Sequence, residues 1–324
     1  MRSKRLAKRI ALCLLLQATP CTPLCPPRQC QAADPSPSAD LLKNCKTAVF
    51  LGDSITFSGQ YVQYVETALR LSLPDRPDLQ ILNLGLSSET VSGLSEDGHA
   101  GGKFPRPNLH ERLARVLKKT KPDLIFACYG MNDGIYLPLE ESRFGAFKEG
   151  IRKLHREAEA AGAKIVHLTP PSFDPGPGEK PGAFNYNATL DAYSTWLIEQ
   201  RSEGWNVIDL HFPMNREIQI RREADPEFRF ARDRIHPNSE GHWVMAREIL
   251  RALALPTEDF TQNPAHTQLL GLVRTRSDLF KLAWLSETGH QRPGVPNGLP
   301  LPDANAEAAK IAEQIQSLIR TQAK

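Results

Sequence analysis

Residues 47–56 read TAVFLGDSIT, an apolar run that changes directly into a polar turn. The run is apolar along its whole length, as expected of a strand buried on both faces of a parallel sheet. The turn places Ser54 where a strand gives way to a helix, so its hydroxyl can face solvent near the backbone N–H groups of the helix start. This is the position of a nucleophile. Asp or Ser before a helix is also an ordinary N-cap, and the stretch alone leaves both interpretations open.

Further apolar runs follow at regular intervals and predict the rest of the sheet. They span residues 79–84, 123–129, 164–169 and 206–210. Amphipathic segments lie between them, most clearly residues 143–161, where apolar side chains recur at helical spacing. The alternation predicts an α/β fold, a three-layer α/β/α sandwich around a five-stranded parallel sheet, in which ligands bind outside the carboxyl ends of the strands.

The first 33 residues have the pattern of a secretory signal peptide. Residues 2–9 hold five Lys/Arg, residues 10–16 form a short apolar core, and Ala32 or Ala33 ends a small-residue cleavage site. We therefore expect an exported protein, periplasmic or secreted, with residues 34–46 as a Pro/Ser-rich linker. An uncleaved anchor and a lipoprotein attached at Cys21 are the alternatives.

Removal of this leader changes the charge and the cysteine count. Residues 1–33 hold six Lys/Arg and no Asp or Glu, which leaves 34 basic against 37 acidic residues, a net charge of −3 in place of +3. No nucleic-acid partner is expected from this balance. Only Cys45 and Cys128 remain, at opposite ends of the predicted sheet, so no disulfide is expected. The histidines show no metal-ligand spacing, and neither a metal nor a cofactor is predicted.

The composition shifts after Pro256 and divides the remaining chain in two. Residues 47–255 hold the predicted sheet domain, closed by a helix at residues 239–253. Residues 256–324 carry two helical patterns, roughly 267–285 and 303–323, around a Pro/Gly-rich joint. We expect a C-terminal helical extension, with a solvated tail as the alternative for the last twenty residues.

Polar residues after the predicted strands supply what acyl transfer by a serine requires. The reaction needs a base, a group that orients the base, and donors for the developing oxyanion. Asp233 stands three residues before His236, so on one loop the carboxylate can hold Nδ1–H while Nε2 faces Ser54. Gly85 follows the second strand and can offer a backbone N–H, and Asn132 follows the third strand and can offer a side-chain amide.

Four ordered motifs resemble those of the SGNH hydrolase superfamily, also called GDSL esterases/lipases. They are Gly52-Asp53-Ser54-Ile55-Thr56, Asn83-Leu84-Gly85, Gly130-Met131-Asn132-Asp133 and Asp233-Arg234-Ile235-His236-Pro237. The resemblance covers about residues 47–253. It implies a flavodoxin-like sheet, Ser54 as nucleophile, His236 as base and Asp233 as its partner. It also implies an oxyanion hole made by the N–H groups of Ser54 and Gly85 and the side chain of Asn132.

The sequence departs from the family pattern after Gly85. The family often has a second glycine in a G-x-S-G-x-T pattern, whereas this chain reads Gly85-Leu86-Ser87-Ser88-Glu89-Thr90. We expect Ser88 to add a side chain and Glu89 to add a charge near the mouth of the cleft.

The function predicted from these features is a serine esterase acting on a short-acyl ester, such as an acetyl ester, of a carbohydrate. Residues 85–107 and 170–185 form long loops that either wall a substrate cleft or simply connect elements. Aromatic residues near them are candidates for sugar stacking or for local packing: Tyr136, Phe173, Phe184 and Tyr186. A small-molecule or polysaccharide ester is the expected partner, without stable membrane association after signal cleavage. Alternatives are a lysophospholipase, thioesterase or acyltransferase of the same superfamily, and a non-catalytic carbohydrate-binding protein.

Overall fold

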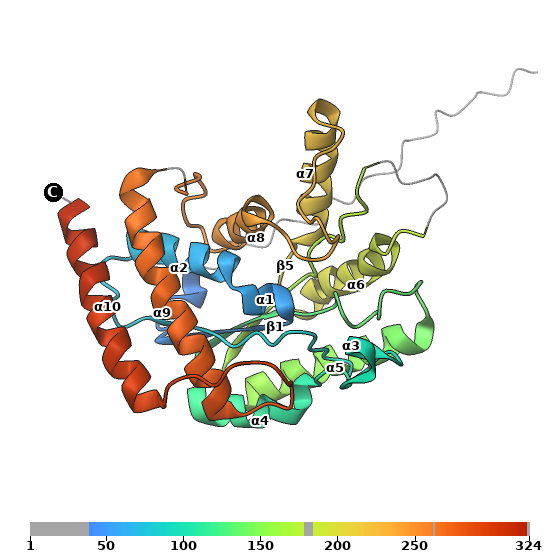
Figure 1. The fold of residues 1–324 in the computed structure, drawn as a ribbon, viewed down its shortest axis with the longest axis horizontal. Helices are drawn as coiled ribbons and strands as arrows, with labels where there is room; N and C mark the ends of the chain where they lie inside the picture. Colours follow the sequence, from blue (N-terminus) through green and yellow to red (C-terminus); the bar gives the residue numbers. More distant parts are fainter. Residues whose placement is uncertain (1–38, 178–183, 262, 323–324) are drawn as a thin grey trace, which may run out of the picture. The chain divides into compact units, whose positions relative to one another are not determined.

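Five parallel strands form one sheet in the order β2-β1-β3-β4-β5 (Figure 1). Their bounds are β1 (Thr47–Gly52), β2 (Gln80–Asn83), β3 (Leu124–Cys128), β4 (Lys164–Leu168) and β5 (Asn206–Ile208). All five predicted strands are confirmed, and so is the α/β class with its five-stranded parallel sheet. The computed structural model describes residues 39–177, 184–261 and 263–322. The predicted signal peptide lies outside these residues.

The strands are buried on both faces, which explains why they read as continuous apolar runs. Phe50 of β1 packs into one layer and stacks on Phe126 of β3, with ring centroids 4.6 Å apart. Its neighbours Val49 and Leu51 pack into the opposite layer. Alternate side chains thus enter two different cores, and neither face of the strand has room for a polar residue.

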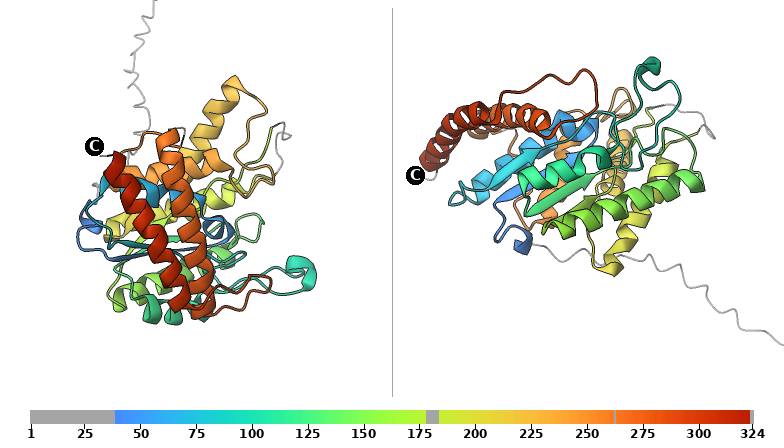
Figure 2. Two further views of the ribbon diagram at one scale, coloured as in Figure 1. Left: turned by 60° about the vertical axis from the view of Figure 1, so that its left-hand side comes forward. Right: turned by 90° about the horizontal axis from the view of Figure 1, so that it is seen from below.

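Helices cover the two faces (Figures 1 and 2). One core contains side chains of α2 (Gln60–Ser72), α7 (His211–Ala224) and α8 (Ser239–Ala252). The other contains side chains of α4 (Leu109–Thr120) and α5 (Glu141–Ala160). Shorter elements are η1 (Ala39–Leu41), α1 (Ser54–Ser58), α3 (His99–Gly102) and η2 (Gln200–Glu203), and α6 (Asn187–Glu199) precedes β5. The helices expected at 143–161 and 239–253 correspond to α5 and α8.

The register of the strands brings several loops to one edge of the sheet. Gly52 at the end of β1 is paired with Cys128 at the end of β3. Beyond β2, the N–H of Leu84 donates to the carbonyl of Phe50 and that of Leu86 donates to the carbonyl of Gly52. The segments that follow β1, β2 and β3 therefore begin side by side, as the sequence predicts for the site.

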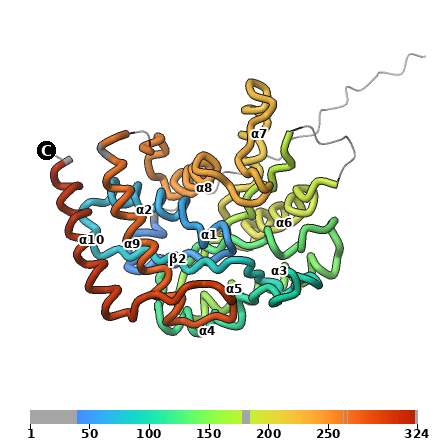
Figure 3. The backbone as a smooth tube through the Cα atoms, in the orientation of Figure 1, coloured from blue at the N-terminus to red at the C-terminus, as the bar shows by residue number. Residues whose placement is uncertain are grey.

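Two long helices follow the sheet domain, α9 (Pro264–Thr288) and α10 (Leu301–Gln322). The first lies against α2, α4 and β2, and α10 packs on α9 (Figures 1 and 3). A buried ion pair joins α9 to α2, since Arg276 Nη1 lies 2.9 Å from Glu66 Oε1. No helix in the described part of the chain combines the length and apolar character that a membrane span requires.

The described part of the predicted linker packs on the sheet domain. Leu41, Leu42 and Cys45 are buried in the core on the α2 face. The backbone N–H groups of Lys46 and Thr47 both donate to Asp123 Oδ2. Cys45 lies before β1 and Cys128 ends β3, and both are buried free thiols.

Candidate active site

Helix α1 begins at Ser54, immediately after β1. Asp53 is its N-cap, and its Oδ1 accepts the N–H of Ile55 at 2.9 Å. Ser54 is therefore the first helical residue, and its own N–H is one of those that a helix cannot satisfy internally. Asp53 supplies the cap while Ser54, which is half-buried, presents its hydroxyl at the sheet edge.

The three predicted catalytic side chains lie in hydrogen-bond contact. Ser54 Oγ is 2.8 Å from His236 Nε2, and His236 Nδ1 is 2.6 Å from Asp233 Oδ2. The other oxygen of Asp233 accepts the backbone N–H groups of Ile235 and His236. Partial burial works against ionisation, but these hydrogen bonds dominate and lower the pKa of Asp233. An ionised carboxylate thus faces one imidazole nitrogen and a serine hydroxyl faces the other.

Gly85 lies against the start of α1, but its N–H already has an acceptor. It donates to Asn83 Oδ1 at 2.9 Å, and Asn83 Nδ2 donates to the carbonyl of Thr56. A Cβ at position 85 would stand 2.4 Å from the backbone nitrogen of Phe57, so only glycine fits. As an oxyanion donor, Gly85 would share its hydrogen between Asn83 and the substrate.

The amide of Asn132 is oriented by two neighbours. Its Nδ2 donates to the carbonyl of Glu89 at 3.2 Å, and its Oδ1 accepts the hydroxyl of Tyr136 at 2.9 Å. Because a backbone carbonyl can only accept, the nitrogen must face Glu89. One amide hydrogen is left for a ligand. This contact of Tyr136 is not expected from the sequence, which suggests only stacking or packing, since an aromatic residue four positions after an asparagine carries no specific signal.

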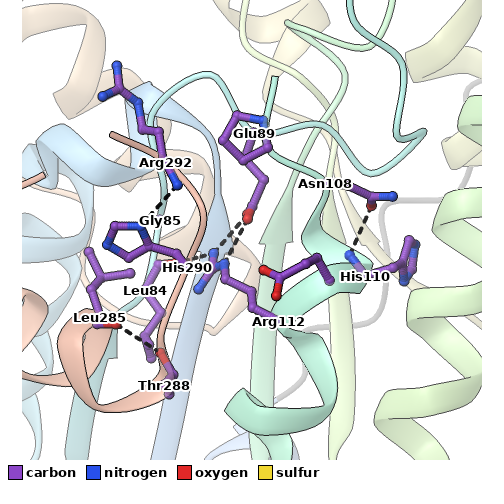
Figure 4. Close-up of polar contacts among 12 residues, drawn as sticks. Leu84, Gly85, Glu89, Asn108, His110, Arg112, Leu285, Thr288, His290 and Arg292 are labelled. Atoms are coloured by element: carbon purple, nitrogen blue, oxygen red, sulfur yellow. Dashed lines mark hydrogen bonds and ion pairs between the residues drawn. The ribbon is translucent and has the colours of Figure 1, made fainter. Parts of the chain in front are cut away.

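The expectation for Glu89 is wrong. Its carboxylate is fully buried and not at a cleft mouth, and it makes a bidentate ion pair with Arg112 (Figure 4). It also accepts the hydroxyl of Tyr129. Ser88 does occupy a position suited to glycine, with φ 68° in the left-handed region. The family pattern of a second glycine is explained by this backbone conformation.

The four aromatic residues considered for sugar stacking form one cluster. Tyr186 is buried at its centre, with ring centroids 5.1 Å from Tyr136, 5.7 Å from Phe173 and 6.5 Å from Phe184. The hydroxyl of Tyr186 donates to the carbonyl of Met131. Local packing thus accounts for Tyr186, whereas Phe184 is 47% exposed and accessible to a ligand.

Asp174 fixes the loop that carries Asp233 and His236, a role that no pattern in the sequence indicates. Its carboxylate is buried, pairs with Arg222 of α7 and accepts the N–H groups of Phe230 and Ala231. Its own N–H donates to the carbonyl of Arg234. The loop after β4 thereby holds the segment just before His236 in place.

An open groove of about 890 Å³ adjoins His236 and Asp233. It is lined by carboxylates, guanidinium groups, an amide and two aromatic rings. Beyond Asp233 and His236, the lining residues are Asp225, Glu227, Phe228, Arg229, Phe230, Arg232, Asn238 and Glu240. The side chains of His236 and Asp233 are 47% and 55% exposed, so the site opens to solvent. Within the described residues, no group of His, Cys, Asp and Glu side chains is arranged to hold a metal ion.

Burial of Asp53 predicts a pH-dependent stability. Burial is the largest cause that raises its pKa from 3.8 to about 7. Between pH 4 and pH 7, Asp53 is protonated in the folded state and ionised in the unfolded state. The contribution of Asp53 to the free energy of unfolding is therefore most favourable below pH 4 and least favourable above pH 7. We expect Asp53→Asn, which keeps the cap acceptor, to raise the free energy of unfolding at pH 8 by up to about 4 kcal/mol, with little gain at pH 4. Urea unfolding of both proteins at the two pH values measures this, and an equal gain at both would contradict it.

Comparison with known proteins gives consistent results. Residues 50–244 match the profile of the GDSL-like Lipase/Acylhydrolase family. The chain is 25% identical over 228 residues to an acetylxylan esterase of Geobacillus stearothermophilus, covering 63% of this chain and 92% of that protein.

Solved structures share the fold. A catalytic mutant of an acetylxylan esterase from Geobacillus stearothermophilus superimposes with a TM-score of 0.51 at 22% identity, covering 65% of this chain and 95% of that chain. LAE5, an alpha/beta hydrolase from the metagenome of Lake Arreo, gives 0.50 at 24% identity, covering 64% and 95%. A gut microbial diltiazem-metabolizing enzyme gives 0.50 at 23% identity, and the chain spans only 47% of that longer protein.

Proposed function

Because the chain belongs to the GDSL-like lipase/acylhydrolase family and is an ester-bond hydrolase, we propose that Ser54, His236 and Asp233 form its catalytic triad. The observation that carries this proposal is the continuous hydrogen-bonded line from Ser54 Oγ through both imidazole nitrogens to Asp233. We propose further that the substrate is a short-acyl ester of a carbohydrate.

In this mechanism Ser54 Oγ attacks the ester carbonyl while His236 Nε2 accepts its proton. Asp233 holds Nδ1–H and stabilises the imidazolium. The N–H of Ser54, the N–H of Gly85 and the free amide hydrogen of Asn132 stabilise the oxyanion. His236 then protonates the departing alcohol, and a water molecule cleaves the acyl-enzyme by the same route.

The open, polar surroundings of the triad support a hydroxyl-rich substrate. The groove beside His236 offers carboxylate, guanidinium and amide groups that can bond to sugar hydroxyls. They lie beside the half-buried ring of Phe228, over which the guanidinium of Arg221 stands 5.4 Å from the centroid. A half-exposed base does not favour a substrate with a long acyl chain, which needs an apolar enclosure. The related acetylxylan esterase supports the same substrate class. Export through a signal peptide at residues 1–33, which we also propose, suits a polysaccharide substrate.

A panel of esters tests the substrate class. We expect kcat/KM for p-nitrophenyl octanoate to be no higher than for p-nitrophenyl acetate, since an open site gains no binding energy from a longer chain. We also expect acetate release from acetylated xylo-oligosaccharides. Ser54→Ala is the control for non-enzymatic hydrolysis. A preference for octanoate, or for lysophospholipids over acetylated sugars, would overturn the carbohydrate assignment. Transfer of acetyl to an added sugar in place of water would identify an acyltransferase.

A further inference from the structure

The loop after β2 serves the proposed oxyanion hole at both of its ends. We call residues 84–90 the Gly85 loop. Near its start, Gly85 offers an N–H, and near its end the carbonyl of Glu89 orients the amide of Asn132. Any shift of this loop would move two of the three proposed donors together.

Both ends of the Gly85 loop are fixed from inside the protein by Arg112 of α4. Its guanidinium makes two bonds of 2.7 Å to the carboxylate of Glu89 and one of 2.7 Å to the carbonyl of Leu84 (Figure 4). Arg112 and Glu89 are both almost fully buried, so the ion pair is shielded from solvent. Ser87 and Ser88, in the middle of the loop, are partly exposed and are not among the groups that Arg112 contacts.

The middle of the loop is held from outside by the last residue of α9 and the segment that follows it. We call residues 288–292 the C-terminal strap. Arg292 Nε donates to the carbonyl of Ser87 at 3.0 Å. The same guanidinium lies over the ring of Phe104, 5.2 Å from its centroid, near the far end of the long β2–α4 connection. One arginine thus contacts that connection at two distant points.

The C-terminal strap is itself anchored to its surroundings, which fixes the backbone of Arg292. The backbone N–H of Arg292 donates to His290 Nδ1 (Figure 4). Arg115 of α4 donates to the carbonyls of Thr288 and Gly289 at 2.6 and 3.3 Å. The strap is therefore tied to the same helix that supplies Arg112.

We infer that Arg292 is a positioning residue that holds the Gly85 loop in its working geometry. The inference rests on the proposed function. Oxyanion stabilisation depends on donors fixed before the reaction, and small displacements of such groups cost rate while they leave ground-state binding nearly intact. Arg292 lies outside the matched family region of residues 50–244. A residue of the C-terminal extension thus positions a loop of the proposed oxyanion hole, while the proposed catalytic residues all lie in the family domain.

Arg292→Ala tests this in the full chain with p-nitrophenyl acetate. We expect kcat to fall about tenfold, because one loop contact is lost and no donor is deleted, with KM changed less than about twofold. Arg292→Lys keeps a cation over Phe104 and a donor within reach of Ser87, and should restore most of kcat. Inhibition by a boronic acid, which forms a tetrahedral adduct on the serine, should weaken in parallel with kcat/KM in Arg292→Ala.

The matched control is Lys119→Ala. Lys119 ties α4 to Glu287 by an ion pair of 2.6 Å, at the same junction with the extension but without contact to the Gly85 loop. It should leave kcat unchanged. If Arg292→Ala lowered the melting temperature but kept wild-type kcat and boronate affinity, Arg292 would be structural only. If Ser54→Ala retained activity, the proposed function would fail independently of Arg292.

Discussion

Ser54→Ala should reduce kcat for p-nitrophenyl acetate on the order of 10⁶-fold, the scale seen when a serine nucleophile is removed. Without Oγ no acyl-enzyme can form, and His236 has no hydroxyl to activate. The substitution removes one exposed hydroxyl hydrogen bond, that to His236. The fold should therefore be unchanged, and far-UV circular dichroism and the melting temperature would verify that.

A fluorophosphonate probe separates the nucleophile from a neighbouring serine. Wild type should label on Ser54, and Ser54→Ala should not label. Ser58→Ala is the matched control, because Ser58 lies one helical turn away and its Oγ also contacts a histidine, His242 Nε2 at 3.2 Å. If Ser58→Ala lost labelling while Ser54→Ala kept it, Ser58 would be identified as the nucleophile. Labelling of neither serine in the wild-type protein would overturn the assignment of Ser54 as the nucleophile.

Asp233→Asn should lower kcat about 10⁴-fold, as expected when the imidazole is held in the wrong tautomer. Asp233 Oδ2 lies 2.6 Å from His236 Nδ1, and its hydrogen bonds keep it ionised and acceptor-only. An amide nitrogen at that position would donate to Nδ1 and place the proton on Nε2, where it blocks proton uptake from Ser54. Steady-state kinetics at pH 8 measures the loss.

Asp53→Asn is the control that decides between the two aspartates near the serine. Asp53 caps α1 through Oδ1, which an asparagine preserves. We expect its kcat within about tenfold of wild type, because it makes no contact in the proton-transfer line. A loss in Asp53→Asn equal to that in Asp233→Asn would show that Asp53 takes part in the chemistry.

The sheet and the contacts among Ser54, His236 and Asp233 could be predicted from the sequence because both rest on local patterns. Strands buried on two faces are apolar at most positions, and the run from Ala48 to Leu51 is buried and apolar throughout. Asp233 and His236 share one turn, so their spacing alone permits contact. In a parallel sheet, the ends of neighbouring strands must also meet at one edge.

The supporting contacts could not be predicted because they join segments far apart in the chain. Glu89 pairs with Arg112, Asp174 pairs with Arg222, and Arg292 reaches Ser87 across 205 positions. No periodicity or spacing encodes such pairs. The charge expected at the cleft mouth from Glu89 was wrong for this reason, since the sequence shows the carboxylate but not the buried guanidinium that receives it.

Helix α9 of the extension lies against β2. β2 is the outermost strand of the sheet on that side, and an uncovered outermost strand offers backbone N–H and C=O groups to which another polypeptide can add. Because α9 packs against β2, we expect it to hinder the addition of a strand from another molecule. Deleting the extension would therefore remove a barrier to aggregation together with Arg292, so single substitutions are the cleaner way to separate solubility from catalysis.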